Sequence, residues 1–454
     1  MRIAIVGLAL LALTPPALAQ QSEAAPGARA ERVWRWVDPD REPFQPWHTD
    51  AEAQARMYAQ ADGDMRAIVG IPLPQPVEVV LSPSFGFFFV TMEVGAKDGS
   101  LLLDTSVSRA MEQLSFVTKA QRKPTTVSAD WRGEPGSALS FAHGVYAPKH
   151  VKRMIVLNCD LTAEQAERAL RHELVHAMQD EAFGFKDFFA FPEITVDQKW
   201  ARQAIEEGYA TLIAEPTEAR VSLDDLASAD WTLQMSGLVY GAGRRLVESV
   251  GERAGSRREL LDLLFQHPPA TTREVLHPEL YQHLLDSGTP LELPSPEGFV
   301  ALRDMLLAAM SSTGHGAAWR SRLGEFGLRC VLSELGLSAD RVDELAPAWR
   351  NDELINHDDW REPSATTVVW SLSTPEAAEA LDAALGQLIS ARSAKLEPVP
   401  MRLGGQALQG HASLGAAGWP DAFIVRSGES VGLVVGDGLG ALVETVRKSA
   451  APER

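Results

Sequence analysis

The chain has 454 residues, 45% hydrophobic and 23% charged, a composition typical of a globular protein long enough for two or three domains. Its formal net charge is −19 at pH 7 and no basic cluster stands out, so we expect no nucleic-acid partner. The acidity favours solubility and, weakly, a neutral or cationic substrate.

The N-terminus has the pattern of a secretory signal. Arg2 supplies a positive start, an apolar run extends from Ile3 to Leu13, and Ala17-Leu18-Ala19 offers a small-residue cleavage site. The run is too short to span a bilayer, and no later stretch is long enough either. We therefore predict a signal peptide at residues 1–19, a periplasmic or extracellular location, and no stable membrane insertion; the alternative is a short buried helix.

Residues 20–60 are predicted to be an N-terminal arm, polar at first and then rich in tryptophan and proline. We expect its aromatic side chains to pack on the main body: Trp34, Trp36, Phe44 and Trp47. The composition of residues 51–69 favours a helix. Runs rich in β-branched and aromatic residues then predict strands at 77–80, 87–94 and 154–157.

The middle of the chain is predicted to be mainly helical. Thr162-Ala163-Glu164-Gln165 has the pattern of a capping box, so a helix should begin there and end near Gly184. Further helices are expected at 197–214, 223–254, 256–265, 298–312 and 328–345.

The tail changes character and mixes strands with helices. A strand is expected at 366–372, a helix to about 390, a hairpin of 422–426 with 430–435, and a last helix at 438–449. The whole chain is therefore predicted to have an α+β fold.

The chain has two cysteines, Cys159 and Cys330. In an oxidising compartment they could pair and tie two distant regions together, and two separate buried thiols are the alternative. Without a CxxC motif they cannot form a thiolate zinc site.

The motif with the clearest chemistry is His172-Glu173-Leu174-Val175-His176, in the predicted helix that follows a strand. His172 and His176 are one turn apart on one helix face, so both imidazoles can reach one ion. Glu173 lies about 100° round the helix, which suits it to act as general base toward a metal-activated water. The motif predicts one Zn2+ per chain, and two histidines on an exposed face are the alternative.

A catalytic zinc needs a third protein ligand and an open position. No histidine follows His176 until His267, so the third ligand should be an acid. Two adjacent residues of the next predicted helix, Glu206 and Glu207, are the candidates.

Helix geometry separates the two glutamates. Glu206 shares a face with Arg202, which favours a solvated ion pair. Glu207 shares its face with small residues that would let this helix approach the HExxH helix closely: Ala204, Gly208 and Thr211. We therefore predict Glu207 as the third ligand.

An HExxH helix followed by a helix with a ligand glutamate resembles the gluzincin arrangement of thermolysin-like peptidases. The resemblance implies a zincin-like catalytic region, zinc-dependent hydrolysis, and a peptide or protein substrate. Thermolysin-type enzymes have an aspartate four residues after the ligand glutamate. Thr211 stands there in this chain, so the group that orients the ligands is left open.

A closer resemblance is to a group of poorly characterised bacterial and archaeal HExxH peptidases with HELxHxxQD and EGxA motifs. In this chain the motifs fall at 172–180 and 207–210. Looser matches follow at Tyr240 with Gly243, Pro268-Pro269, 276–281 and 349–352, where Trp-Arg-Asn-Asp replaces Trp-Gly-Gly-Asp. The likeness covers about residues 150–440.

Several further residues are weaker candidates for the site. Asp180 could support the ligands, with a surface acid at the helix end as the alternative. Tyr209, Tyr240 and His277 could each donate a hydrogen bond to an oxyanion, with plain packing as the alternative, and we retain Tyr240 and His277 with Glu173 as catalytic candidates. Strand 154–157 could be the sheet edge that pairs with an extended substrate, or simply an interior strand.

The sequence therefore predicts a signal at 1–19, an arm at 20–60, a mainly helical zincin-like region at 61–350 and an α+β subdomain at 360–450. The predicted activity is hydrolysis of peptide bonds. The alternatives are a non-catalytic exported binding protein that contains zinc, and a zinc hydrolase of a non-peptide amide. Substrate preference and oligomeric state are left open.

Overall fold

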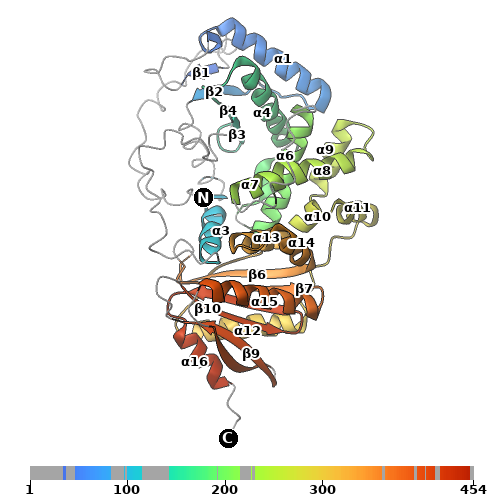
Figure 1. Ribbon diagram of the computed structural model, residues 1–454. Coiled ribbons are helices and arrows are strands. Elements are labelled where there is room, and N and C mark those ends of the chain that lie inside the picture. The colour runs from blue at the N-terminus through green and yellow to red at the C-terminus, as the bar shows by residue number, and fades with distance from the viewer. Residues whose placement is uncertain are drawn as a thin grey trace.

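The computed structural model describes residues 34–36, 46–82, 97, 100–114, 143–191, 193–214, 226, 231–359, 363–392, 396–403, 405–414 and 420–449. The predicted signal peptide, the strand predicted at 87–94 and Phe44 lie outside these ranges. The predicted α+β class is confirmed: a mainly helical part precedes a seven-stranded antiparallel sheet (Figure 1).

A small four-stranded sheet lies beside the HExxH helix. Its order is β1-β2-β4-β3, with bounds Trp34–Trp36, Glu78–Ser82, Met154–Asn158 and Gly144–Ala147. The first three strands run parallel and β3 is antiparallel to β4. Every residue of β4 is buried because strands cover both of its edges and α4 (Ala163–Phe183) packs against it.

The helical part follows the predicted order closely. The predicted helices at 51–69, 162–183 and 197–214 correspond to α1 (Ala51–Val69), α4 and α6 (Val196–Ala214). The helix expected at 223–254 is three consecutive segments where it is described: α7 (Trp231–Ser236), the π-helix η5 (Gly237–Ala242) and α8 (Gly243–Gly251). The shorter helices are α3 (Ser100–Leu114), α5 (Phe185–Phe189), α9 (Arg257–Gln266), α10 (Thr272–Leu276) and α11 (Pro278–Ser287).

The C-terminal sheet has the order β5-β6-β7-β11-β10-β9-β8. The predicted strand and hairpin correspond to β7 (Ala365–Leu372), β10 (Asp421–Ser427) and β11 (Ser430–Gly436). Four strands of this sheet were not predicted from the sequence: β5 (Ala317–Ser321), β6 (Trp349–His357), β8 (Glu397–Leu403) and β9 (Gln406–Ser413).

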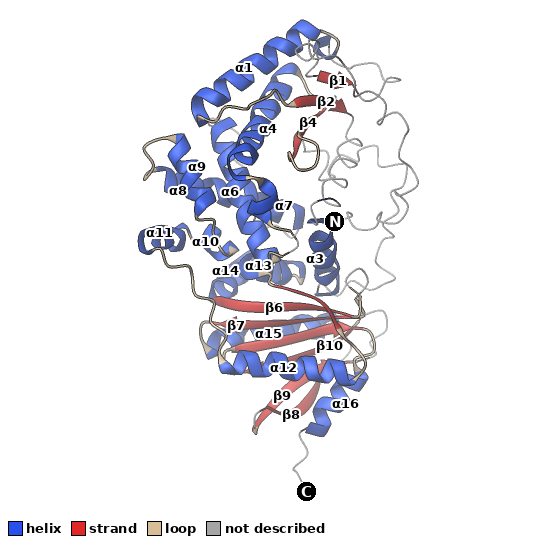
Figure 2. Ribbon diagram, turned by 180° about the vertical axis from the view of Figure 1, so that it is seen from behind, coloured by secondary structure: helices blue, strands red, loops and turns tan. Residues whose placement is uncertain are grey.

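Helices cover both faces of this sheet, so its central strands are apolar on both sides. α15 (Pro375–Arg392) packs on the face that carries Val368 and Trp370. On the opposite face, α12 (Glu297–Ser312) and α16 (Gly440–Ser449) cover Val369. Figure 2 shows these two helices beside the strands of the sheet. Two more helices, α13 (Gly324–Glu334) and α14 (Ala339–Leu345), join the sheet to the helical part.

The structure also bears on the predictions about the cysteines, membrane insertion and the domain boundaries. Cys159 and Cys330 are both buried and no disulfide joins them, which is the second of the two alternatives. Among the helices described, none is long and apolar enough to cross a membrane. The domain boundaries stay predictions. Helix α1 continues across the predicted boundary at residue 60. Strands β5 and β6 fall wholly or partly within the range predicted for the helical region, but they belong to the C-terminal sheet.

Candidate metal centre

The two histidines of the motif lie on one face of α4. The helix begins where the sequence predicts: Thr162 is the N-cap, its hydroxyl accepts from the Gln165 backbone N–H, and the Gln165 side chain accepts from the Thr162 N–H. One turn apart, the imidazole rings of His172 and His176 have centroids 4.7 Å from each other. His176 is buried, with 4% of its surface exposed.

Glu207 of α6 completes a group of three ligand-type side chains. Its Oε2 lies 3.0 Å from His172 Nε2 and 3.4 Å from His176 Nε2. The ligand atoms of these three residues all lie within 4.8 Å of one another. Tetrahedral zinc with bonds of about 2.0–2.1 Å separates its ligand atoms by about 3.3 Å, so the two spacings suit such an ion. Two imidazole nitrogens and one carboxylate oxygen are also the donor set of a catalytic zinc site.

The charges at this group are tightly coupled. Burial disfavours the charged form of His176, but the neighbouring acids Glu207, Glu206 and Glu173 together outweigh it and raise the pKa of His176 to about 10. Burial likewise favours the neutral acid at Glu207, yet His176 and His172 hold its pKa well below the usual range. A cation between them would take over the role of the imidazole protons, so metal binding and protonation compete here.

Glu206 is not the solvated acid that the sequence predicts. Its side chain is 13% exposed, and its Oε1 lies 3.5 Å from His176 Nδ1, on the opposite side of the ring from Glu207. Its expected partner Arg202 donates instead to the Phe188 carbonyl. Burial raises the pKa of Glu206 to about 8. The i−4 pairing fails because α6 turns this face toward α4 rather than toward solvent.

Gln179 contacts both helices of the site. Its Oε1 lies 2.8 Å from His176 Nδ1, and its Nε2 donates to the Glu206 carbonyl oxygen over 3.1 Å. The residue is fully buried. The sequence analysis assigned Gln179 no role, although its position three residues after His176 puts it on the same helix face.

Glu173 lies beside the histidines and faces β3. The chain passes so close that a Cβ on Gly144 would come within 2.7 Å of Glu173 Oε1. Burial raises the pKa of Glu173, while His172, His176 and the backbone N–H of Tyr146 favour its charged form less strongly. Glycine at position 144 therefore makes room for this carboxylate, and burial makes the carboxylate more basic.

The strand predicted as a possible substrate-binding edge is not at the edge of the small sheet. The strand predicted at 154–157 is β4, which has β2 on one side and β3 on the other. Within the described part of the chain, β3 is the terminal strand on this side of the sheet. The strand adjacent to Glu173 is therefore one of the two terminal strands of this sheet, as far as the chain is described.

The small residues on α6 contact a different helix from the one predicted. A Cβ on Gly208 would lie 2.4 Å from the Gly243 carbonyl carbon, and one on Gly243 would lie 2.0 Å from the Ala204 oxygen. At these small residues, the backbone of α6 therefore lies against the backbone of α8, while α6 also packs against α4. The π-helix η5 directly precedes this crossing and carries Tyr240, whose ring centroid is 6.5 Å from that of His172. π-helical turns often occur at functional sites, where they redirect a side chain.

Asp180 is neither a partner of the ligands nor a surface acid. It is fully buried, and its carboxylate accepts from the Tyr146 hydroxyl and from the backbone N–H groups of Lys149 and Phe185. It therefore braces the end of α4 against the segment that contains β3. Tyr209 donates its hydroxyl to the Arg257 carbonyl, which corresponds to the packing alternative.

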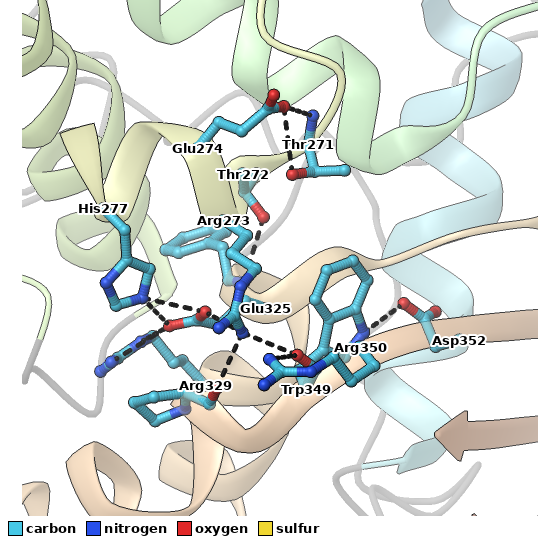
Figure 3. A network of polar contacts seen from close by, with 12 residues as sticks. Thr271, Thr272, Arg273, Glu274, His277, Glu325, Arg329, Trp349, Arg350 and Asp352 are labelled. Atoms are coloured by element: carbon cyan, nitrogen blue, oxygen red, sulfur yellow. Dashed lines mark hydrogen bonds and ion pairs between the residues drawn. The ribbon is translucent and has the colours of Figure 1, made fainter. Parts of the chain in front are cut away.

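His277 belongs to a polar cluster between α10 and α13. Its Nε2 lies 3.0 Å from Oε1 of Glu325, which is fully buried and also meets Arg273 and Arg329 (Figure 3). Arg273 donates further to two backbone carbonyls, those of Pro347 and Trp349. These contacts give His277 a place in the packing of the two helices, and its oxyanion role stays a prediction.

The comparisons with known proteins assign no family to the chain. No family model, no curated protein and no solved structure matches it. What supports the resemblance to HExxH enzymes is therefore the motif together with the convergence of His172, His176 and Glu207.

Proposed function

We propose that this protein is a zinc-dependent hydrolase of peptide bonds. The observation that carries the proposal is the convergence of two imidazole nitrogens and one carboxylate oxygen, with the Glu173 carboxylate beside them. When bound, zinc supplies a Lewis acid that lets water lose its proton near neutral pH. His172, His176 and Glu207 would hold the ion.

Glu173 has the properties of a general base. It takes the proton of the attacking water and later gives it to the leaving amine. Burial raises its pKa, which strengthens it as a base. Tyr240 stays our candidate for donating a hydrogen bond to the developing oxyanion, because its ring lies near that of His172.

The terminal position of β3 among the described strands of the small sheet favours a peptide over other amides. A strand edge presents unpaired N–H and C=O groups, and an extended peptide can add to it by main-chain hydrogen bonds. Because Glu173 lies against Gly144 of this strand, a peptide bound there would pass next to the general base. We propose the same edge as the substrate-binding strand. Export to the periplasm or beyond stays a prediction from the N-terminal sequence.

The test is metal removal from the purified protein. Hydrolysis of a mixed peptide library is measured with the protein as isolated, after treatment with a chelator, and after zinc is added back. We expect cleavage that disappears with the chelator and returns with zinc. Cleavage that survives removal of all bound metal would refute the proposal, and one bound zinc per chain with no peptide cleaved would favour the zinc-containing binding protein.

A further inference from the structure

We infer that Gln179 is the positioning residue of this metal centre, holding His176 with its proton on Nδ1 so that Nε2 is left free for the metal. The inference rests on the proposed metal centre and concerns how its second histidine is oriented. A histidine that binds a metal usually donates its other ring N–H to a neighbouring acceptor, which fixes the tautomer and the orientation of the ring.

The two ring nitrogens of His176 face different partners. Its Nε2 faces Glu207 Oε2 at 3.4 Å, on the side where the three ligand atoms converge, and its Nδ1 faces away from it. A neutral imidazole has one N–H and one lone pair. For Nε2 to keep its lone pair for a metal, the proton must be on Nδ1, where it needs an acceptor.

Gln179 offers that acceptor, and its amide orientation is determined by a third group. The carbonyl oxygen of Glu206 can only accept a hydrogen bond, so the amide nitrogen of Gln179 must face it, at 3.1 Å. The amide oxygen then points to His176 Nδ1 at 2.8 Å. A backbone carbonyl on α6, one residue before the third ligand, thus selects the tautomer of a histidine on α4.

Glu206 is the competing acceptor at the same nitrogen. Its Oε1 lies 3.5 Å from His176 Nδ1, beyond the usual N–H···O range of about 2.7–3.2 Å. Gln179 at 2.8 Å is within that range and is fully buried. Gln179 therefore makes the hydrogen bond, and Glu206 is the more distant acceptor.

The test is the zinc affinity of substituted proteins, measured by competition with a chelating dye, together with the visible spectrum of the cobalt-substituted protein. Gln179→Met keeps the length of the side chain and removes both hydrogen bonds. We expect zinc to bind about 10–100-fold more weakly, the usual loss when a partner of a metal ligand is removed. We also expect the cobalt bands to shift, because His176 can rotate.

Two further variants separate positioning from packing. Gln179→Glu keeps an acceptor opposite Nδ1, so it should bind zinc more tightly than Gln179→Met and remains informative if the latter does not fold. Gln54→Met removes another buried glutamine, one that donates to the Trp47 and His48 carbonyls, and should leave zinc affinity and the cobalt spectrum unchanged.

Each outcome has a distinct meaning. Zinc affinity of Gln179→Met equal to wild type would overturn the inference, as would equal weakening in Gln179→Met and Gln179→Glu. Absence of zinc binding in the wild type would instead refute the metal centre itself. Tight zinc binding without peptide cleavage would refute the proposed hydrolysis and leave the role of Gln179 standing.

Discussion

Two adjacent glutamates have different positions around the same histidine. Glu207 faces the Nε2 side, where both imidazoles converge, and Glu206 faces the Nδ1 side. Both are largely shielded from solvent, so burial does not distinguish them. What distinguishes them is the 100° step between neighbours on a helix, which directs one carboxylate to the candidate metal and the other to the back of the ring.

The pair gives a matched test of the third ligand. Glu207→Gln replaces a charged oxygen donor with a neutral amide, so we expect zinc affinity to fall by more than about 100-fold, beyond the loss typical of supporting residues. Glu206→Gln is the control and should lose much less. Equilibrium dialysis against zinc measures both. The assignment fails if Glu207→Gln binds zinc as tightly as wild type.

The sequence predicts which residues lie together on one helix. It does not predict contacts that depend on how two helices pack against each other. His172 and His176 follow from the period of a single helix. Glu207 is the predicted residue that joins them, but the premises used to select it are wrong, because Glu206 is not solvated and the small residues of α6 contact α8. The position of Glu206 and the contact from Gln179 to the Glu206 carbonyl depend on how α4 and α6 cross, which periodicity does not specify.

The crossing of α6 and α8 is the closest helix contact near the site. Gly208 follows Glu207 directly, and its backbone lies against that of Gly243. Helices with larger residues at a contact stay about 8–10 Å apart, so glycine at both positions is what allows this approach. The positions of Glu207 on α6 and of Tyr240 before α8 therefore depend on glycine, which has no side chain, at both contact positions.

Alanine at this crossing should be destabilising. In Gly208→Ala the new Cβ would lie 2.4 Å from a backbone carbon, which a rotamer change cannot relieve. We expect a loss of about 1–3 kcal/mol in the free energy of unfolding, measured with denaturant, and weaker zinc binding. Gly63→Ala in α1 is the control, because it meets nothing within 4 Å and should be stabilising by about 0.5–1 kcal/mol. Equal stability of the two variants would contradict this account of the crossing.

Elements were predictable where the local pattern is strong. The helix containing the motif was found with its cap, because Thr162 and Gln165 form the predicted capping box. The β8–β9 hairpin was missed because β8 contains Pro398 and Pro400, which argue against a strand. At the end of the sheet order β8 is an edge strand, the position where proline is tolerated.

Buried acids join segments that are far apart along the chain: Asp197 links α6 to α10 within the helical part, and Asp352 links β6 to the start of α13. Asp197, in the first turn of α6, accepts from the backbone N–H and the hydroxyl of Thr272, both at 2.7 Å. Asp352 of β6 accepts from the Gly324 N–H and the Trp349 indole (Figure 3). Burial raises the pKa of Asp197 to about 7 and that of Asp352 to about 6. Such long-range joints could not be predicted from the sequence, since the partners are far apart along the chain.

These raised pKa values give stability a pH dependence. Asp197 ionises near pH 3.8 when unfolded and near 7 when folded, so its neutral form stabilises the fold at low pH and this contribution is lost as pH rises toward 7. We expect wild type to lose unfolding free energy relative to Asp197→Asn between pH 4 and 7. Denaturant titrations of both proteins across that range measure the difference. A difference that stays constant, or grows in favour of wild type, would contradict the buried state assigned to Asp197.

The central claim is hydrolysis by this metal centre with Glu173 as its base. Glu173→Gln keeps the shape of the side chain and removes the proton acceptor, while the three candidate ligands stay in place. The most direct measurement is therefore peptide-library cleavage by wild type and Glu173→Gln at equal, measured zinc content. We expect one zinc per chain in both proteins and cleavage by wild type alone. Cleavage at the wild-type rate by Glu173→Gln would contradict it.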